Sequence, residues 1–280
     1  MAAHIATVNG PRLKAMVVPR EHGAWGMMLV PLATGAIVAL RSCVNGGALT
    51  LFMIAAMSLF WLRTPVEAWL GTSAIKAQTQ TERAFVLRVI LGIALLAAAC
   101  IAALLWNGHN RGLLLIGGVA ALAFAVQAGV KRLGRKGRMP AQIIGAVGLT
   151  STAAGAYYVA AGKLDLTAIA LWLANWLFAG NQIHYVQVRI RSSRAATMDE
   201  KLQQGFGFLA GQVLVIGVIL TACRLRVFPA PVAFAFVPAL FRGSLWFVRG
   251  RQALDVHKLG YSELRQALIF GALLGAAYFL

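Results

Sequence analysis

Long apolar runs follow one another along the whole sequence, and they limit the fold more than any other feature. They are about 18–24 residues long and rich in Leu, Ala, Val, Ile and Gly. A helix of about 20 residues crosses the roughly 30 Å of hydrocarbon in a bilayer. Inside a bilayer only helices and closed barrels satisfy their own backbone hydrogen bonds, and barrel strands alternate polar and apolar residues. These runs are continuous, so the sequence predicts an all-α, polytopic membrane helical bundle.

The positions of the apolar runs predict about nine transmembrane helices in a single membrane domain, residues 1–280. The predicted spans are 23–40, 48–70, 85–106, 112–130, 140–161, 165–187, 205–223, 228–247 and 263–280. Small residues from Gly145 to Gly155 predict close helix contact on the fifth span. Residues 1–19 contain no signal-peptide apolar stretch, so the first span is expected to stay as an anchor.

Charge supports the same interpretation and gives an orientation. The chain is 60% hydrophobic and 12% charged, whereas soluble domains carry about 25% charged residues. The net charge is +18, but the basic residues lie in short loops between apolar runs, so nucleic acid is not an expected partner. With the N-terminus in the cytoplasm, 20 of the 26 Lys and Arg residues face inward and five face outward. This positive-inside bias predicts a cytoplasmic N-terminus and an external C-terminus.

Polar side chains gather at the cytoplasmic ends of the predicted spans. A charge in the middle of a membrane helix costs roughly 2.5–3.5 kcal/mol on insertion, so retained polar groups indicate a site. The candidate substrate-binding residues are Arg20, Glu21, His22, Arg63, Asn181, Gln182, Arg189, Arg191 and Arg242. Glu67 and His184 are the candidate catalytic residues, because each can move a proton or orient an acceptor. We expect a cavity that opens to the cytoplasm and has an apolar inner part.

Several of these residues also have a purely structural interpretation. Arg20 to His22 can form an interfacial cap at a helix start. Arg63 and Glu67 are four residues apart, so they can form an ion pair on one helix face. Arg189 and Arg191 can set topology and touch lipid phosphates. The three cysteines have no disulfide or metal spacing, and no metal site is predicted.

Three segments resemble signatures of the YwiC-like bacterial membrane proteins. Residues 19–25, Pro-Arg-Glu-His-Gly-Ala-Trp, are similar to the Pro-Lys/Arg-Glu-His-Gly-Ala-Trp segment that opens this family. Residues 63–65 match its Arg-x-Pro, and residues 260–263 match its late Gly-x-x-Glu. The resemblance covers essentially the whole chain. It implies a multi-pass protein of the bacterial inner (plasma) membrane.

A more distant resemblance is to the UbiA superfamily of prenyltransferases, which have nine helices, the same orientation and a cytoplasm-facing site. Gln182 and His184 resemble part of the Trp-Gln-x-Pro-His-Phe helix of haem O synthases, one residue closer together and without the proline. UbiA enzymes hold Mg²⁺ with two aspartate-rich motifs. Here the loop after span two has no aspartate, and the loop after span six has only Asp199-Glu200. The sequence therefore does not identify a cofactor. In a metal-independent alternative, arginine side chains bind the diphosphate directly.

Three functions follow from this resemblance and its departures. The first is a divergent UbiA-type prenyltransferase that acts on an isoprenoid diphosphate or quinone-like lipid without the aspartate-rich magnesium motifs. The alternative is a non-catalytic lipid- or quinone-binding or assembly protein. A small-solute transporter ranks third, because acidic residues near the bilayer midplane and inverted repeats are not seen in the sequence.

Overall fold

The computed structural model describes residues 10–19, 22–42, 44–73, 75–108, 110–134, 137–193, 195, 197–249 and 254–280. These residues form ten helices and no strand, which confirms the predicted all-α class. The helices group into two compact units. Unit 1 comprises residues 1–22 and 47–110, and unit 2 comprises residues 23–46 and 111–280.

Each predicted span coincides with one helix. The bounds are α2 His22–Ala39, α3 Gly46–Trp69, α4 Gln80–Trp106, α5 Asn110–Lys131, α6 Arg138–Ala161, α7 Leu166–Arg191, α8 Met198–Arg224, α9 Val232–Val248 and α10 Val256–Ala277. Three of these helices, α4, α8 and α10, begin five to seven residues earlier than predicted, because polar side chains cap their starts. Thr79 and Thr197 form capping boxes with Glu82 and Glu200, at α4 and α8. Asp255 caps α10.

The cap at α10 depends on pH. The carboxylate of Asp255 accepts a hydrogen bond from the backbone N–H of Lys258 at 3.1 Å. This hydrogen bond lowers the pKa of Asp255 from its ordinary value. A lowered pKa in the folded state means that the charged cap stabilises the fold above the pKa of Asp255 in the unfolded chain. That contribution is lost as the pH falls through the folded-state pKa.

Five helices are long and apolar enough to cross a membrane. They are Gly46–Trp69, Gln80–Trp106, Arg111–Lys131, Arg138–Ala161 and Met198–Arg224, and Trp25–Ala39 and Val232–Val248 are shorter apolar helices. Large apolar side chains remain uncovered on α4 and α5, as at Leu95 (71% exposed) and Leu114 (64% exposed). Such surfaces suit lipid rather than water. The chain is therefore a multi-pass membrane protein, and the count of nine crossings stays a prediction.

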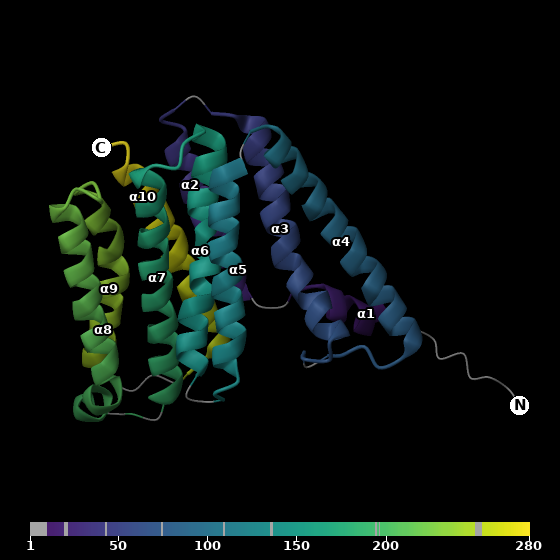
Figure 1. The fold of residues 1–280 in the computed structure, drawn as a ribbon. Coiled ribbons are helices and arrows are strands. Elements are labelled where there is room, and N and C mark those ends of the chain that lie inside the picture. The colour runs from purple at the N-terminus through teal and green to yellow at the C-terminus, as the bar shows by residue number, and fades with distance from the viewer. Residues whose placement is uncertain are drawn as a thin grey trace, which may run out of the picture. The chain divides into compact units, whose positions relative to one another are not determined.

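Unit 1 contains a short helix, α1 (Gly10–Val17), that the apolar runs did not predict (Figure 1). It packs against α4. Arg12 Nε donates to Glu82 Oε1 at 2.8 Å, and Trp61 Nε1 donates to the Val17 carbonyl at 2.8 Å. The buried side chains beneath it are Met16, Ala68, Ala77 and Val86. Tertiary contacts therefore hold α1 in place, since one helical turn or two is unstable alone.

In unit 2, α6 lies in the interior, and its small residues allow close packing. Thr152 Oγ1 on α6 donates to the Met28 carbonyl of α2 at 3.3 Å. On the α7 side, the indoles of Trp172 and Trp176 donate to α6 carbonyls at 2.9 and 3.1 Å. Figure 1 shows α6 and α7 side by side, in agreement with their contacts. The close helix contact predicted for this span is confirmed.

Candidate functional site

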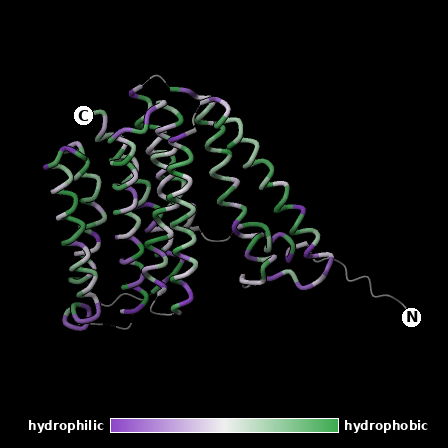
Figure 2. The backbone as a smooth tube through the Cα atoms, viewed as in Figure 1, coloured by the Kyte–Doolittle hydropathy of each residue, from purple (hydrophilic) through white to green (hydrophobic). Residues whose placement is uncertain are grey.

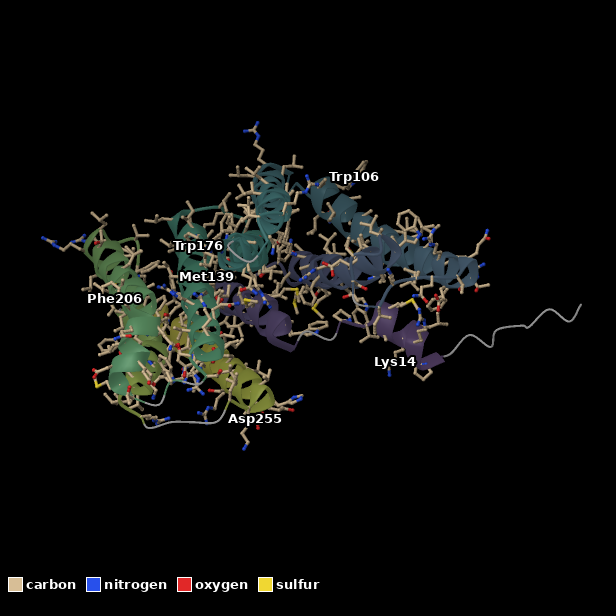
Figure 3. The ribbon with its side chains drawn as sticks, turned by 90° about the horizontal axis from the view of Figure 1, so that it is seen from below. Lys14, Trp106, Met139, Trp176, Phe206 and Asp255 are labelled. Atoms are coloured by element: carbon tan, nitrogen blue, oxygen red, sulfur yellow. The ribbon has the colours of Figure 1, made fainter. Side chains whose placement is uncertain are left out.

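Polar side chains from four helices meet at one end of unit 2, where α7 and α9 end and α8 and α10 begin. Figure 2 shows hydrophilic residues at the lower end of α8, and Figure 3 views this end of unit 2, with Asp255 at the start of α10. We call this group the basic cluster. Its members are Gln182, Tyr185, Arg189, Ser192, Lys201, Arg242, Trp246 and Glu263.

The centre of the basic cluster is an ion pair between α9 and α10. Both terminal nitrogens of Arg242 donate to the carboxylate of Glu263, with Nη2 at 3.0 Å from Oε2. The two side chains are only 14% and 11% exposed. The guanidinium carbon lies 4.2 Å from the centroid of the Tyr185 ring, a cation–π arrangement. Gln182 Nε2 donates to the Glu263 carbonyl at 3.2 Å, so α7, α9 and α10 are joined here.

A second part of the cluster surrounds Trp246 at the end of α9. Lys201 is 2% exposed, and its ammonium donates to the carbonyls of Trp246, at 3.3 Å, and of Arg249. The same ammonium lies 5.4 Å from the centroid of the Trp246 ring. Arg189 Cζ lies 5.9 Å from that centroid. Two cations from α7 and α8 therefore flank one indole ring.

The charged members of the cluster are mostly basic. Arg189, Lys201 and Arg242 are three cations, and Glu263 is the single carboxylate among the described members of the cluster. Two hydrogen-bond donors of the cluster also lack acceptors. Arg242 Nε and the Ser192 hydroxyl are buried with no hydrogen-bond partner in the part of the chain that the structure describes. A buried polar group without a partner costs about 1–3 kcal/mol. The arrangement therefore suits a ligand that brings negative charge and acceptor oxygens.

A small pocket lies beside these cations. Arg189, Ser192, Lys201, Trp246 and Leu254 line it, with Ser193 and Ala195. Its volume is about 10 Å³, which is room for about one water molecule. A larger group fits only when side chains that line the pocket, such as Leu254, move aside.

The predicted site residues fall into separate groups. Arg20 and Glu21 lie outside the described residues, and His22 is described only as the first residue of α2. Arg63 and Glu67 form the predicted ion pair on α3 in unit 1, with Nε 2.9 Å from Oε1, and both are partly exposed.

The other predicted residues belong to unit 2. Asn181 is buried on α7, and Gln182 belongs to the basic cluster. The His184 ring meets the Phe208 ring edge-on, with centroids 5.3 Å apart. Arg191 is exposed, with Nη2 3.6 Å from Met139 Sδ. Arg189 and Arg242 are thus the predicted arginines that the structure brings into one cluster with Gln182.

Lys201, Tyr185 and Trp246 were not predicted as site residues. Lys201 was assigned to a loop, because the span was predicted to start at residue 205. The capping box from Thr197 to Glu200 places Lys201 inside the first turn of α8. Thr-x-x-Glu before an apolar run is a sequence signal for a helix start, and it marks this residue as helical.

The carboxylates near this end do not fit a pair of magnesium ions. Asp199 and Glu200 are exposed, and Glu200 Oε2 accepts the Thr197 N–H at 3.3 Å. No group of three or more His, Cys, Asp or Glu side chains converges among the described residues. Magnesium bound to a substrate diphosphate needs carboxylate oxygens, so no step is assigned to this metal.

Comparison with known proteins identifies one family. A family model described as YwiC-like protein matches residues 18–157, which is half of the chain. The matched part contains Arg63 and Glu67 and ends before α7 and the basic cluster. None of the curated proteins compared with the chain matches it.

Proposed function

Because the chain belongs to the YwiC-like protein family, we propose that it is a multi-pass protein of the bacterial plasma membrane that binds a phosphate-bearing lipid at the basic cluster. The observation that carries this proposal is the convergence of three cations, Arg189, Lys201 and Arg242, at one end of unit 2, where the buried Arg242 Nε and Ser192 hydroxyl have no hydrogen-bond partner among the described residues. A phosphate group carries negative charge, which a cluster of cations attracts, and its oxygens accept hydrogen bonds from donors such as these.

The chemistry of the cluster favours a lipid over a small soluble anion. Arginine binds phosphate oxygens in a fork, and lysine binds them as a point charge. The same pocket is lined by Trp246 and Leu254, which offer an apolar surface to the first carbons of a chain. Isoprenoid diphosphates have this combination of a phosphate-bearing head and an apolar chain. They are the first ligands to test.

The proposal includes nine crossings, a cytoplasmic N-terminus and a basic cluster that faces the cytoplasm. Arg132 lies in the connection before α6 and Lys163 in the connection after it, and Lys163 is 56% exposed. In a cysteine-free background, we expect Lys163→Cys to react with a membrane-impermeant maleimide on intact cells. Arg132→Cys should react only after the cells are permeabilised. The reverse pattern, or labelling of both residues from one side, contradicts the proposed orientation.

Removal of one cation from the pocket should weaken lipid binding. Farnesyl diphosphate is the probe, titrated against the full-length protein in detergent micelles and followed by calorimetry. We expect Arg189→Gln to raise the dissociation constant by about 10- to 100-fold, because a hydrogen bond to a charged group contributes about 1.5–3 kcal/mol. Arg189 is half-buried at the end of α7, so the variant should still fold.

The matched control is Lys258→Gln, which removes the same charge from a side chain that is 87% exposed on α10. Its dissociation constant should stay within about twofold of the wild-type value, since an exposed charge contributes little. The proposal is wrong if the wild-type protein shows no saturable binding, or if Arg189→Gln binds as tightly as the control.

Prenyl transfer is the finer hypothesis at the same cluster. In this hypothesis, His184 or Glu67 moves a proton or orients an acceptor. However, Glu67 is paired with Arg63, and His184 packs against Phe208. These contacts favour binding without turnover. Release of inorganic diphosphate from farnesyl diphosphate, in the presence of membrane lipid extract, would support the transferase instead.

A further inference from the structure

A larger pocket lies at the opposite end of unit 2, where α2, α8 and α10 end and α7 begins. Its volume is about 380 Å³, which is within the range of small-ligand sites. The lining residues come from all four helix ends and from the connection between α8 and α9. The polar ones are Arg41, Thr167, Cys223, Arg226 and Tyr278, and apolar walls are provided by Leu166, Val227 and Phe228. On α7, Thr167 of this pocket and Gln182 and Arg189 of the basic cluster are 15 and 22 residues apart, so about 22–33 Å of helix separates the two sites.

Two arginines give this pocket a positive charge. Arg41 follows the end of α2, and Arg226 follows the end of α8. None of the lining residues in the described part of the chain is acidic. The nearest helix start carries Asp165, but its carboxylate accepts the N–H of Thr167 at 3.0 Å and lies 3.4 Å from Lys163 Nζ. The negative charge of Asp165 is therefore already paired with Lys163, outside the pocket lining.

The backbone conformation of Arg226 is unusual. Its φ is 58°, and it is the one non-glycine residue with positive φ among the described residues. The N–H of Val227 donates to the Ala222 carbonyl at 2.9 Å, and the N–H of Arg226 donates to the Cys223 carbonyl at 3.1 Å. These bonds form a Schellman motif, in which glycine is the usual residue at this position. An arginine in this conformation is less stable than a glycine would be, which indicates that its guanidinium has a function.

Tyr278 gives an independent indication of a ligand. Its side chain is only 4% exposed, and it lines the pocket. Its hydroxyl is buried with no hydrogen-bond partner in the part of the chain that the structure describes. Buried hydroxyls are almost always hydrogen-bonded, so a small shift of the pocket wall that brings a ligand oxygen to this hydroxyl would supply the acceptor it lacks.

We propose that this pocket binds a phosphate-bearing anion, held by Arg41 and Arg226 and by the hydroxyls of Tyr278 and Thr167. The group is the phosphate of a membrane lipid or free phosphate. The apolar walls suit the first carbons of a lipid chain, and the two arginines suit its phosphate. The site is separate from the basic cluster and does not depend on the function proposed there.

Cys223 lines the pocket and provides a local reporter. The full-length protein is placed in nanodiscs of phosphatidylcholine, or of phosphatidylcholine with phosphatidylglycerol, and alkylated with the neutral reagent iodoacetamide. Peptide mass spectrometry follows the rate at Cys223. We expect phosphatidylglycerol to slow this rate at least fivefold. Protection by inorganic phosphate in phosphatidylcholine nanodiscs would instead assign the site to the free ion.

Variants separate this site from a general effect of the anionic surface. Arg226→Gly removes the guanidinium and places glycine where the backbone favours it, so the variant should fold. It should abolish the protection of Cys223. Arg224→Gln removes the same charge from an exposed residue that does not line the pocket, and protection should remain. Equal alkylation rates in all lipids and at all phosphate concentrations, or protection that persists in Arg226→Gly, would overturn the proposal.

Discussion

Glu263→Ala is expected to lower the free energy of unfolding by about 3–5 kcal/mol, because it leaves Arg242 buried without its counter-charge. The two side chains are 14% and 11% exposed, and both carboxylate oxygens accept from the guanidinium. The loss should appear in sodium dodecyl sulfate titrations of the full-length protein in mixed micelles. The guanidinium also packs on the Tyr185 ring, so near-ultraviolet circular dichroism should change.

Two controls test the assignment of this loss to the buried charge. Lys258→Ala disrupts an exposed pair with Asp255 and should change stability by less than about 0.5 kcal/mol. The double variant Arg242→Met with Glu263→Met removes both charges and keeps the volume, so most of the stability should return. A double variant as unstable as Glu263→Ala alone would show that packing, rather than unpaired charge, determines the loss.

Gly35→Ala is expected to destabilise the protein by about 3 kcal/mol, at the upper end of the usual effect of overpacking. A Cβ atom at Gly35 would lie 2.1 Å from the carbonyl oxygen of Ala153. This atom belongs to the backbone of α6, so it cannot move aside as a flexible side chain does. A sodium dodecyl sulfate titration of the full-length protein in mixed micelles measures this loss of stability.

Gly117→Ala on α5 is the matched control, because a Cβ atom there meets no atom within 4 Å. Alanine has the higher helix propensity, so this variant should be more stable by about 0.5–1 kcal/mol. Equal stability of the Gly35→Ala variant and the wild-type protein would mean that α2 and α6 are not packed as closely as described.

Apolar length predicted the positions of the main helices well, because hydrocarbon requires continuous apolar runs. Apolar length did not predict where α4, α8 and α10 begin. The first turn of α8 carries Asp199, Glu200 and Lys201, and hydropathy assigns such residues to a loop. The caps at Thr197 and Asp255 carry the missing information, since they satisfy the free N–H groups of a helix start.

Contacts between distant residues were the second limit. Arg63 and Glu67 are four residues apart, so helix geometry alone predicted their ion pair. Arg242 and Glu263 are 21 residues apart and meet only because α9 packs against α10. The short helix α1 was missed for the same reason: its stability depends on contacts such as Arg12 with Glu82.

An electron cryomicroscopy map of the full-length protein with bound farnesyl diphosphate tests most directly whether the basic cluster binds a lipid phosphate. The proposed function predicts density for the diphosphate within hydrogen-bonding distance of Arg189 and Lys201, with the Leu254 side chain displaced from the pocket. Density for the diphosphate away from both residues, or an unchanged pocket at saturating ligand, would contradict it.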